Sequence, residues 1–112
     1  MTALERAAQR RGVKAPTAAT LRRYGLTVDD WLRLLKAQGW KCAVCERRVA
    51  TWNTDHEHVP GWKKMPPDER ARYVRGVLCA FCNYRLVPSR LPARAADRIA
   101  RYLRAYESRR DA

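Results

Sequence analysis

Four cysteines form two pairs, Cys42-Ala43-Val44-Cys45 and Cys79-Ala80-Phe81-Cys82, which bracket a short segment of acid and histidine residues. Each Cys-x-x-Cys turn can offer two thiolates, and four thiolates complete a tetrahedral zinc site with no open ligand position. Residues 46–78 separate the pairs, more than the ~15–20 residues of a compact zinc ribbon, so we expect a hairpin with an insertion between them. The sequence predicts one structural zinc ion, held by Cys42, Cys45, Cys79 and Cys82.

The enclosed segment is Thr54-Asp55-His56-Glu57-His58, and Asn83 follows the last cysteine directly. Phosphodiester hydrolysis requires an activated water and positive charge on the leaving oxygen. A neutral imidazole can take a proton from water, and carboxylate and amide oxygens suit Mg²⁺ or Mn²⁺. Neighbouring residues of a strand point to opposite sides, so Asp55 and His56 could flank one phosphate. This pattern indicates a nuclease site with His56 as base and Asp55 and Asn83 as metal ligands.

Each of these residues also has a structural interpretation. A histidine can be a zinc ligand or a packed core side chain, an aspartate can occupy a turn, and Asn83 can cap the helix that follows the second cysteine pair. Four cysteines already satisfy zinc, and His56 and His58 are the only histidines in the chain. We therefore favour a functional role for both histidines.

The composition favours a polyanionic partner. The 112-residue chain has 24 Lys and Arg against 11 Asp and Glu, a net charge of +13 that is spread over its whole length. Such a charge is typical of nucleic-acid-binding proteins. No segment approaches the ~20 apolar residues of a membrane span, and residues 1–11 lack the apolar run of a signal peptide. We expect a cytoplasmic protein without membrane contact, in which paired cysteines bind metal instead of forming disulfides.

The pattern predicts one α+β domain over residues 1–112, mainly helical. We expect a helix from Ala3 to Arg11, a helical turn ending near Tyr24, and a helix that starts at a Thr27/Asp30 capping box and stops at Gly39. Trp31 belongs to the apolar stripe of that helix and is assigned to the core.

Residues 49–58 and 74–78 are rich in β-branched and aromatic residues and predict two strands. The insertion at residues 60–73 lies between them, and its paired prolines favour a loop plus a short helix. We expect residues 80–86 to be helical until Pro88. A basic helix over residues 92–108 would pack its apolar stripe on the core or on a second subunit; the stripe comprises Ile99, Tyr102, Leu103 and Tyr106.

Several basic residues and one tryptophan lie near the predicted site in sequence. We assign phosphate contacts to the basic residues, although each could be a solvated charge. Trp62 could stack on a base or wedge into a base step, or it could simply hold the insertion on the core. Gly76 would let another backbone approach the second strand. The predicted nucleic-acid-binding residues are Trp62, Lys63, Lys64, Arg72 and Arg75.

From about residue 24 to residue 83 the sequence resembles the phage recombination endonuclease VII family of the HNH, or ββα-metal, superfamily. The resemblance is carried by Tyr24-Gly25-Leu26-Thr27, by residues 39–45, by Thr54-Asp55-His56-Glu57-His58, and by Val74-Arg75-Gly76-Val77-Leu78-Cys79 through Asn83. The insertion at 60–73 is longer than the short turn of many members. Some members also carry an acid at the position of Leu86.

The resemblance implies a zinc-stapled ββα-metal core over residues 24–86. Within that core, His56 would be the general base, Asp55 and Asn83 would bind Mg²⁺, and His58 would support the phosphate. It further implies a DNA endonuclease for branched substrates such as four-way junctions, a homodimer, and a phage protein acting in the bacterial cytoplasm. A flap, a mismatch or plain duplex as substrate, and nicking against double cutting, stay open.

Two other functions compete with the nuclease. A non-catalytic zinc module that binds nucleic acid would share the cysteines and the charge, but it has no use for Asp55, His56 and Asn83 together. A zinc nucleobase deaminase needs His-x-Glu and Pro-Cys-x-x-Cys. Here His56 and Glu57 are adjacent, and Leu78 precedes Cys79, so the deaminase pattern is not met.

Overall fold

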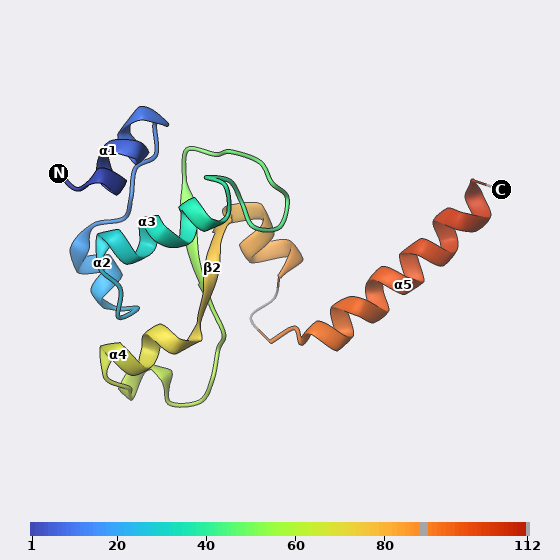
Figure 1. Ribbon diagram of the computed structural model, residues 1–112. Helices are drawn as coiled ribbons and strands as arrows, with labels where there is room; N and C mark the ends of the chain where they lie inside the picture. The colour runs from blue at the N-terminus through green and yellow to red at the C-terminus, as the bar shows by residue number, and fades with distance from the viewer. Residues whose placement is uncertain (88–89, 112) are drawn as a thin grey trace.

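A two-stranded antiparallel sheet lies between three N-terminal helices and a long C-terminal helix (Figure 1). The computed structural model describes residues 1–87 and 90–111. The sheet pairs β1 (Trp52–His56) with β2 (Val74–Cys79), and the predicted pair of strands is confirmed. The helices that precede it are α1 (Ala3–Arg10), α2 (Ala18–Arg22) and α3 (Val28–Ala37).

The helix starts and stops follow from local chemistry. Thr27 accepts a hydrogen bond from the Asp30 amide while Asp30 accepts one from the Thr27 amide, so the predicted capping box of α3 is confirmed. Gly39 ends this region with a φ of +77°, in the left-handed region that glycine tolerates best. Trp31 has no exposed surface, as expected for the core, and its indole Nε1 donates to Thr54 Oγ1 at 3.0 Å.

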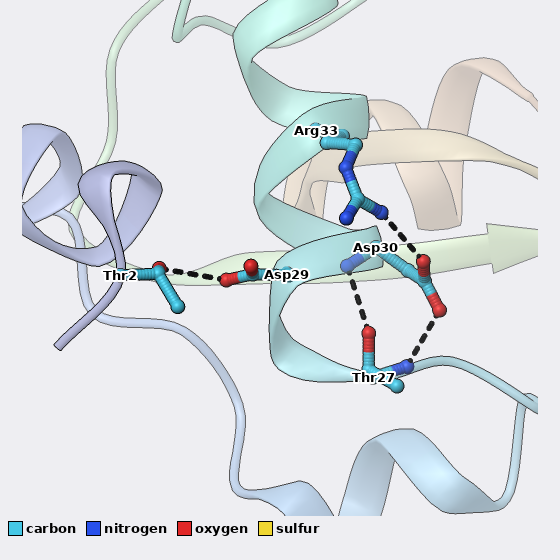
Figure 2. A network of polar contacts seen from close by, with 5 residues as sticks. All are labelled: Thr2, Thr27, Asp29, Asp30 and Arg33. Atoms are coloured by element: carbon cyan, nitrogen blue, oxygen red, sulfur yellow. Dashed lines mark hydrogen bonds and ion pairs between the residues drawn. The ribbon is translucent and has the colours of Figure 1, made fainter.

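A polar contact ties the N-terminal helix to the first turn of α3 (Figure 2). The Thr2 hydroxyl accepts from the Glu5 amide and donates to Asp29 Oδ1 at 2.9 Å. The neighbouring Asp30 carboxylate is also held by Arg33 at 2.8 Å. Both carboxylates therefore lie at the N-terminus of α3, where the helix dipole favours negative charge.

The side-chain amide of Gln38 completes the free edge of β2. Its Oε1 accepts from the Val77 amide at 2.9 Å, and its Nε2 donates to the carbonyl oxygens of Val77 at 2.7 Å and Lys41 at 3.0 Å. A Cβ at Gly76 would lie 2.9 Å from Gln38 Oε1. The prediction that Gly76 admits a close neighbour is confirmed, but the neighbour is a side-chain amide instead of a backbone.

The insertion at residues 60–73 is a compact series of short helices. It contains η1 (Trp62–Lys64), α4 (Pro67–Arg70) and η2 (Ala71–Tyr73), which extends the predicted loop plus short helix. Gly25, with a φ of +73°, receives the Pro67 carbonyl so closely that a Cβ there would lie 1.8 Å from its oxygen. The insertion is therefore packed against the end of α2 and does not hang free as a loop.

Beyond the sheet the chain turns at Ala80 and Phe81 into the π-helical segment η3 (Cys82–Leu86), and the expected helical stop at Pro88 lies outside the described residues. The final helix α5 (Ala93–Arg110) projects away from the body (Figure 1). Its apolar stripe does not pack on the core, because Ile99, Tyr102, Leu103 and Tyr106 are between 50% and 77% exposed. Within the described residues, no helix is both long and apolar enough to span a membrane.

We predict that Gln38→Leu lowers the free energy of unfolding by about 1–3 kcal/mol, because it leaves the partly buried Val77 amide without its acceptor and removes one of the two donors to the Val77 carbonyl, whose other donor is the Ala43 amide. Leucine has a similar size, so the loss reports on hydrogen bonding. Urea denaturation of the metal-loaded protein measures the change. Gln9→Leu, at an exposed position of α1, is the matched control and should change the value by less than about 0.5 kcal/mol. Equal stability of the two variants would contradict the edge-completing role of Gln38.

Candidate functional site

The four cysteines converge on one point, although they come from two distant segments. Their Sγ atoms all lie within 4.8 Å of one another, and those of Cys45 and Cys79 are 3.7 Å apart. A tetrahedral zinc with Zn–S bonds of about 2.3 Å separates its sulfurs by about 3.8 Å. The donor set and its spacing therefore fit a zinc ion, with Cys42 and Cys45 from a turn after α3 and Cys79 and Cys82 from the junction of β2 and η3.

Hydrogen bonds to sulfur support thiolate character at this site. The Cys79 amide donates to Cys42 Sγ, the Cys82 amide to Cys79 Sγ, and Arg47 Nε to Cys45 Sγ, each at 3.4 Å. The bond from Arg47 lowers the pKa of Cys45 to about 6. Burial, together with the neighbouring cysteines, raises the pKa of Cys82 to about 12. Binding of a zinc ion here would displace the thiol protons that the cysteines carry, because only the thiolate is a zinc ligand.

Beside the cysteine cluster lies a cleft of about 580 Å³. It is lined by all four residues that the sequence predicts to be catalytic: Asp55 and His56 from β1, His58 just after it, and Asn83 from η3. Asn83 directly follows Cys82, so closing the cysteine cluster brings the start of η3 to the wall formed by β1. The remaining lining residues are Pro16, Thr20, Tyr24, Trp52, Asn53, Thr54, Tyr84 and Val87.

A β-bulge interrupts the strand pairing within the site. Asp55 pairs with Gly76 but His56 pairs with Val74, so Arg75 has no partner in β1. Bulges break the regular alternation of side chains and re-aim them, often next to active sites. The expectation that Asp55 and His56 flank a phosphate from opposite sides assumes a regular strand. The extra residue, Arg75, lies in β2, while Asp55 and His56 are consecutive residues of β1 that both line the cleft; that they flank one phosphate stays a prediction.

Arg75 makes a bidentate ion pair with Asp55. Its Nε and Nη2 lie 2.8 and 3.0 Å from the two carboxylate oxygens, and Asp55 is only 6% exposed. A buried carboxylate needs such a partner, because removing an ion from water is costly unless it is paired. The sequence assigns the Arg75 guanidinium to a DNA phosphate, but in the free protein it is already paired with Asp55, the predicted metal ligand.

His56 lies within a cluster of rings. Its imidazole stacks on His58 with ring centroids 4.5 Å apart and on Trp62 with centroids 4.3 Å apart, and Tyr24 meets its edge at 5.6 Å. Burial lowers the pKa of His56 below its usual 6.5, the nearby His58 lowers it further, and Asp55 acts in the opposite sense. The imidazole is therefore neutral at neutral pH, which is the state a general base requires.

The other predicted nucleic-acid contacts lie outside the cleft. Lys63, Lys64 and Arg72 are exposed on the insertion, and the half-buried Trp62 stacks on His56. Sequence reasoning assigns no role to Thr20, Trp52 or Tyr84, which line the cleft, and it places Tyr24 only within a family motif. One sequence signal could have placed Tyr24 near another element. It precedes Gly25, and a glycine at that position indicates a turn where another segment approaches closely.

Comparison with known proteins matches residues 17–105 to the family model of recombination endonuclease VII. Two relatives are the gene 59 proteins of Mycobacterium phage L5, 32% identical over 63 residues, and of Mycobacterium phage D29, 30% identical over 63 residues. Each alignment covers 54% of this chain and 32% of the relative, so the chain spans about a third of the length of the curated relatives it matches. No solved structure matches.

We predict that Arg75→Met lowers the free energy of unfolding by about 1–3 kcal/mol, because it leaves the buried Asp55 carboxylate unpaired. In an Asp55→Asn background the same substitution should lower the free energy of unfolding much less, because residue 55 then carries no charge that needs a partner. Urea denaturation of the four proteins forms a double-mutant cycle. Additive effects of the two substitutions would show that the pair contributes no coupling energy.

We predict that the purified protein binds one zinc ion per chain and that Cys82→Ala abolishes stoichiometric binding and lowers the melting temperature. The reason is that zinc bound to thiolates contributes directly to folding free energy. Mass spectrometry of the intact protein and elemental analysis measure the metal. Val44→Ala changes an exposed side chain within the first cysteine turn and should retain the ion. Full zinc occupancy in Cys82→Ala would exclude the four-cysteine site.

Proposed function

The chain belongs to the recombination endonuclease VII family, and from this premise we propose that it is a metal-dependent DNA endonuclease that hydrolyses phosphodiester bonds. We further propose that β1, β2 and η3 form a ββα-metal core of the HNH type, stapled by zinc at the four cysteines. The single observation that carries the proposal is the cleft of about 580 Å³ lined by Asp55, His56, His58 and Asn83.

In this proposal His56 is the general base. Proton transfer uses the lone pair in the plane of an imidazole ring, and the stacked neighbours of His56 cover its faces instead of its edges. Its lowered pKa keeps the ring neutral at neutral pH. His58 lies beside it on the cleft wall, where an imidazole N–H can donate a hydrogen bond to a phosphate oxygen.

Asp55 and Asn83 would hold a magnesium ion. A carboxylate offers about four lone-pair positions, and the fork of Arg75 uses two of them, so Asp55 keeps acceptor capacity for a cation. A side-chain amide oxygen from Asn83 is a second hard donor in the same cleft. When bound, such a cation stabilises negative charge on the leaving oxygen. Arg75 fixes the orientation of the Asp55 carboxylate.

The basic surface supports DNA as the substrate. Arg94, Arg98, Arg101 and Arg104 line one groove on α5 together with Asp97, and Lys63, Lys64 and Arg72 are exposed on the insertion. We propose that these side chains contact phosphates, which would make binding fall steeply with salt. We also propose branched DNA as the substrate, a homodimer that uses the exposed stripe of α5, and action in the cytoplasm of a phage-infected bacterium.

The test is cleavage of matched linear, flapped and four-way DNA by the zinc-loaded protein, with the oligomer mass measured in the same buffer. Magnesium is omitted and added back, because a chelator would also remove zinc from the cysteines. We expect cleavage only with added magnesium and fastest on a branched substrate. DNA binding without cleavage of any substrate would support a non-catalytic binding module and contradict the enzyme.

We predict that His56→Ala lowers the single-turnover cleavage rate by about 10²- to 10⁴-fold, the contribution typical of a general base, while DNA affinity changes little. Gel-based cleavage and fluorescence anisotropy at fixed salt measure the two quantities. Gln9→Ala, at an exposed position of the distant helix α1, serves as control and should cleave at the original rate. A His56→Ala variant that cleaves normally would remove His56 from the reaction.

A further inference from the structure

Trp62 covers one face of the imidazole that the proposed function assigns to proton transfer. The two rings are nearly parallel, with an interplanar angle of 23° and centroids 4.3 Å apart. His58 stacks on His56 as well, at 4.5 Å and 22°. Two rings cannot share one face at these separations without overlapping, so His56 lies between them. Only the edges of the imidazole stay available.

The indole has a further contact, with Arg70. The Arg70 guanidinium lies over the Trp62 ring, 5.2 Å from its centroid, an arrangement typical of a cation–π contact. Tyr24 touches both rings, with centroids 5.6 Å from His56 and 5.8 Å from Trp62. The result is a stack of His58, His56 and Trp62, with Arg70 over the indole and Tyr24 next to both His56 and Trp62.

Backbone carbonyl groups hold the Arg70 side chain in place. Its guanidinium donates to the carbonyl oxygens of Lys63 at 2.6 Å, Met65 at 3.0 Å and Arg23 at 3.0 Å. The first two bonds hold the η1 turn that carries Trp62, and the third joins the insertion to the residue before Tyr24. Gly25 adds a second junction, because it receives the Pro67 carbonyl. The insertion and the end of α2 are therefore one rigid unit around His56.

The indole nitrogen of Trp62 also indicates that this residue serves to stack on His56. Its indole Nε1 is buried and has no hydrogen-bond acceptor within residues 1–87 and 90–111. A buried tryptophan usually finds an acceptor for this group, and leaving it without one is unfavourable. At this position Trp62 therefore contributes the flat apolar face of its ring and not a hydrogen bond. A buried Nε1 also cannot reach a DNA base.

We propose that the insertion at residues 60–73 is a brace for the catalytic imidazole and that Trp62 is its positioning residue. This inference rests on the proposed function, because it assigns Trp62 a role through His56. In this role Trp62 does not contact a DNA base; it affects the rate of DNA cleavage indirectly, through His56. Restricting the imidazole to one plane directs its in-plane nitrogens at the cleft, and misplacement of a reacting group by about 1 Å can cost about 100-fold in rate.

The test compares Trp62→Leu, which removes the flat face, with Trp62→Phe, which keeps a ring that can stack. Arg70→Met is a second probe, because it releases the brace without changing either stacked ring. Glu69→Gln, an exposed carboxylate of the same insertion, is the matched control. Zinc content and circular dichroism of every variant establish that the fold is retained. Should Trp62→Leu fail to fold, Trp62→Phe and Arg70→Met still decide the question.

The first readout is independent of activity. The chain contains only two histidines, so the imidazole proton signals are few, and a His56→Ala spectrum assigns them. In zinc-loaded protein without magnesium or DNA, stacking on Trp62 shifts the His56 ring protons upfield. We expect Trp62→Leu to abolish that shift, Trp62→Phe to keep most of it, Arg70→Met to reduce it, and Glu69→Gln to leave it unchanged.

The second readout separates positioning from binding. A positioning role predicts that Trp62→Leu lowers kcat by about 10- to 100-fold with KM nearly unchanged, and that Trp62→Phe restores most of the rate. A raised KM with unchanged kcat would overturn the proposal in favour of a DNA contact. Unmoved His56 signals in Trp62→Leu would overturn it as well. If the unaltered protein cleaves no DNA, the nuclease function fails, while the signal shift alone still tests whether Trp62 holds the ring.

Discussion

Convergence of the four cysteine sulfurs is the constraint on which the site depends. The two cysteine turns are far apart in sequence, yet their sulfurs lie within 4.8 Å of one another. Four thiolates at that distance would repel one another, and a zinc ion bound between them would neutralise part of their charge. One consequence extends beyond the cluster: Cys82 is the first residue of η3, and Asn83 follows it, so the same closure sets the amide opposite β1. In a chain of 112 residues apolar packing contributes little stability, and a zinc ion bound by these four cysteines would add to it.

The predictable parts of the fold are those determined by neighbouring residues. The capping box of Thr27 and Asp30, the stop at Gly39 and the paired cysteines each act within a few residues, so their sequence pattern carries the full physical cause. The candidate catalytic set is predictable for a related reason. Few residue types suit metal-assisted hydrolysis, and they occur beside the cysteine pairs, so chemistry alone narrows the choice to a handful of side chains.

The contacts that escape prediction all depend on long-range geometry. Arg75 is basic and adjacent to the site, which favours a phosphate contact, and nothing in its local sequence shows that a bulge turns it onto Asp55. Trp62 has the sequence context of a base-stacking residue, while its true neighbour, His56, is fixed by how the insertion packs on Gly25. The stripe of α5 has perfect helical spacing, but spacing reveals only that a face is apolar, and not what covers it.

The bulge at Asp55 and His56 connects these observations. In a regular antiparallel pair, each residue lies opposite one residue of the neighbouring strand. The register shift leaves Arg75 without a partner in β1, and its guanidinium pairs with Asp55, which lines the same cleft as His56. A distorted strand end allows more than one side-chain orientation, so each functional group needs its own restraint. Asp55 has the bidentate guanidinium of Arg75, and His56 has rings on both faces. The long insertion therefore restrains His56 as Arg75 restrains Asp55, because it carries Trp62, one of the two rings that stack on the imidazole.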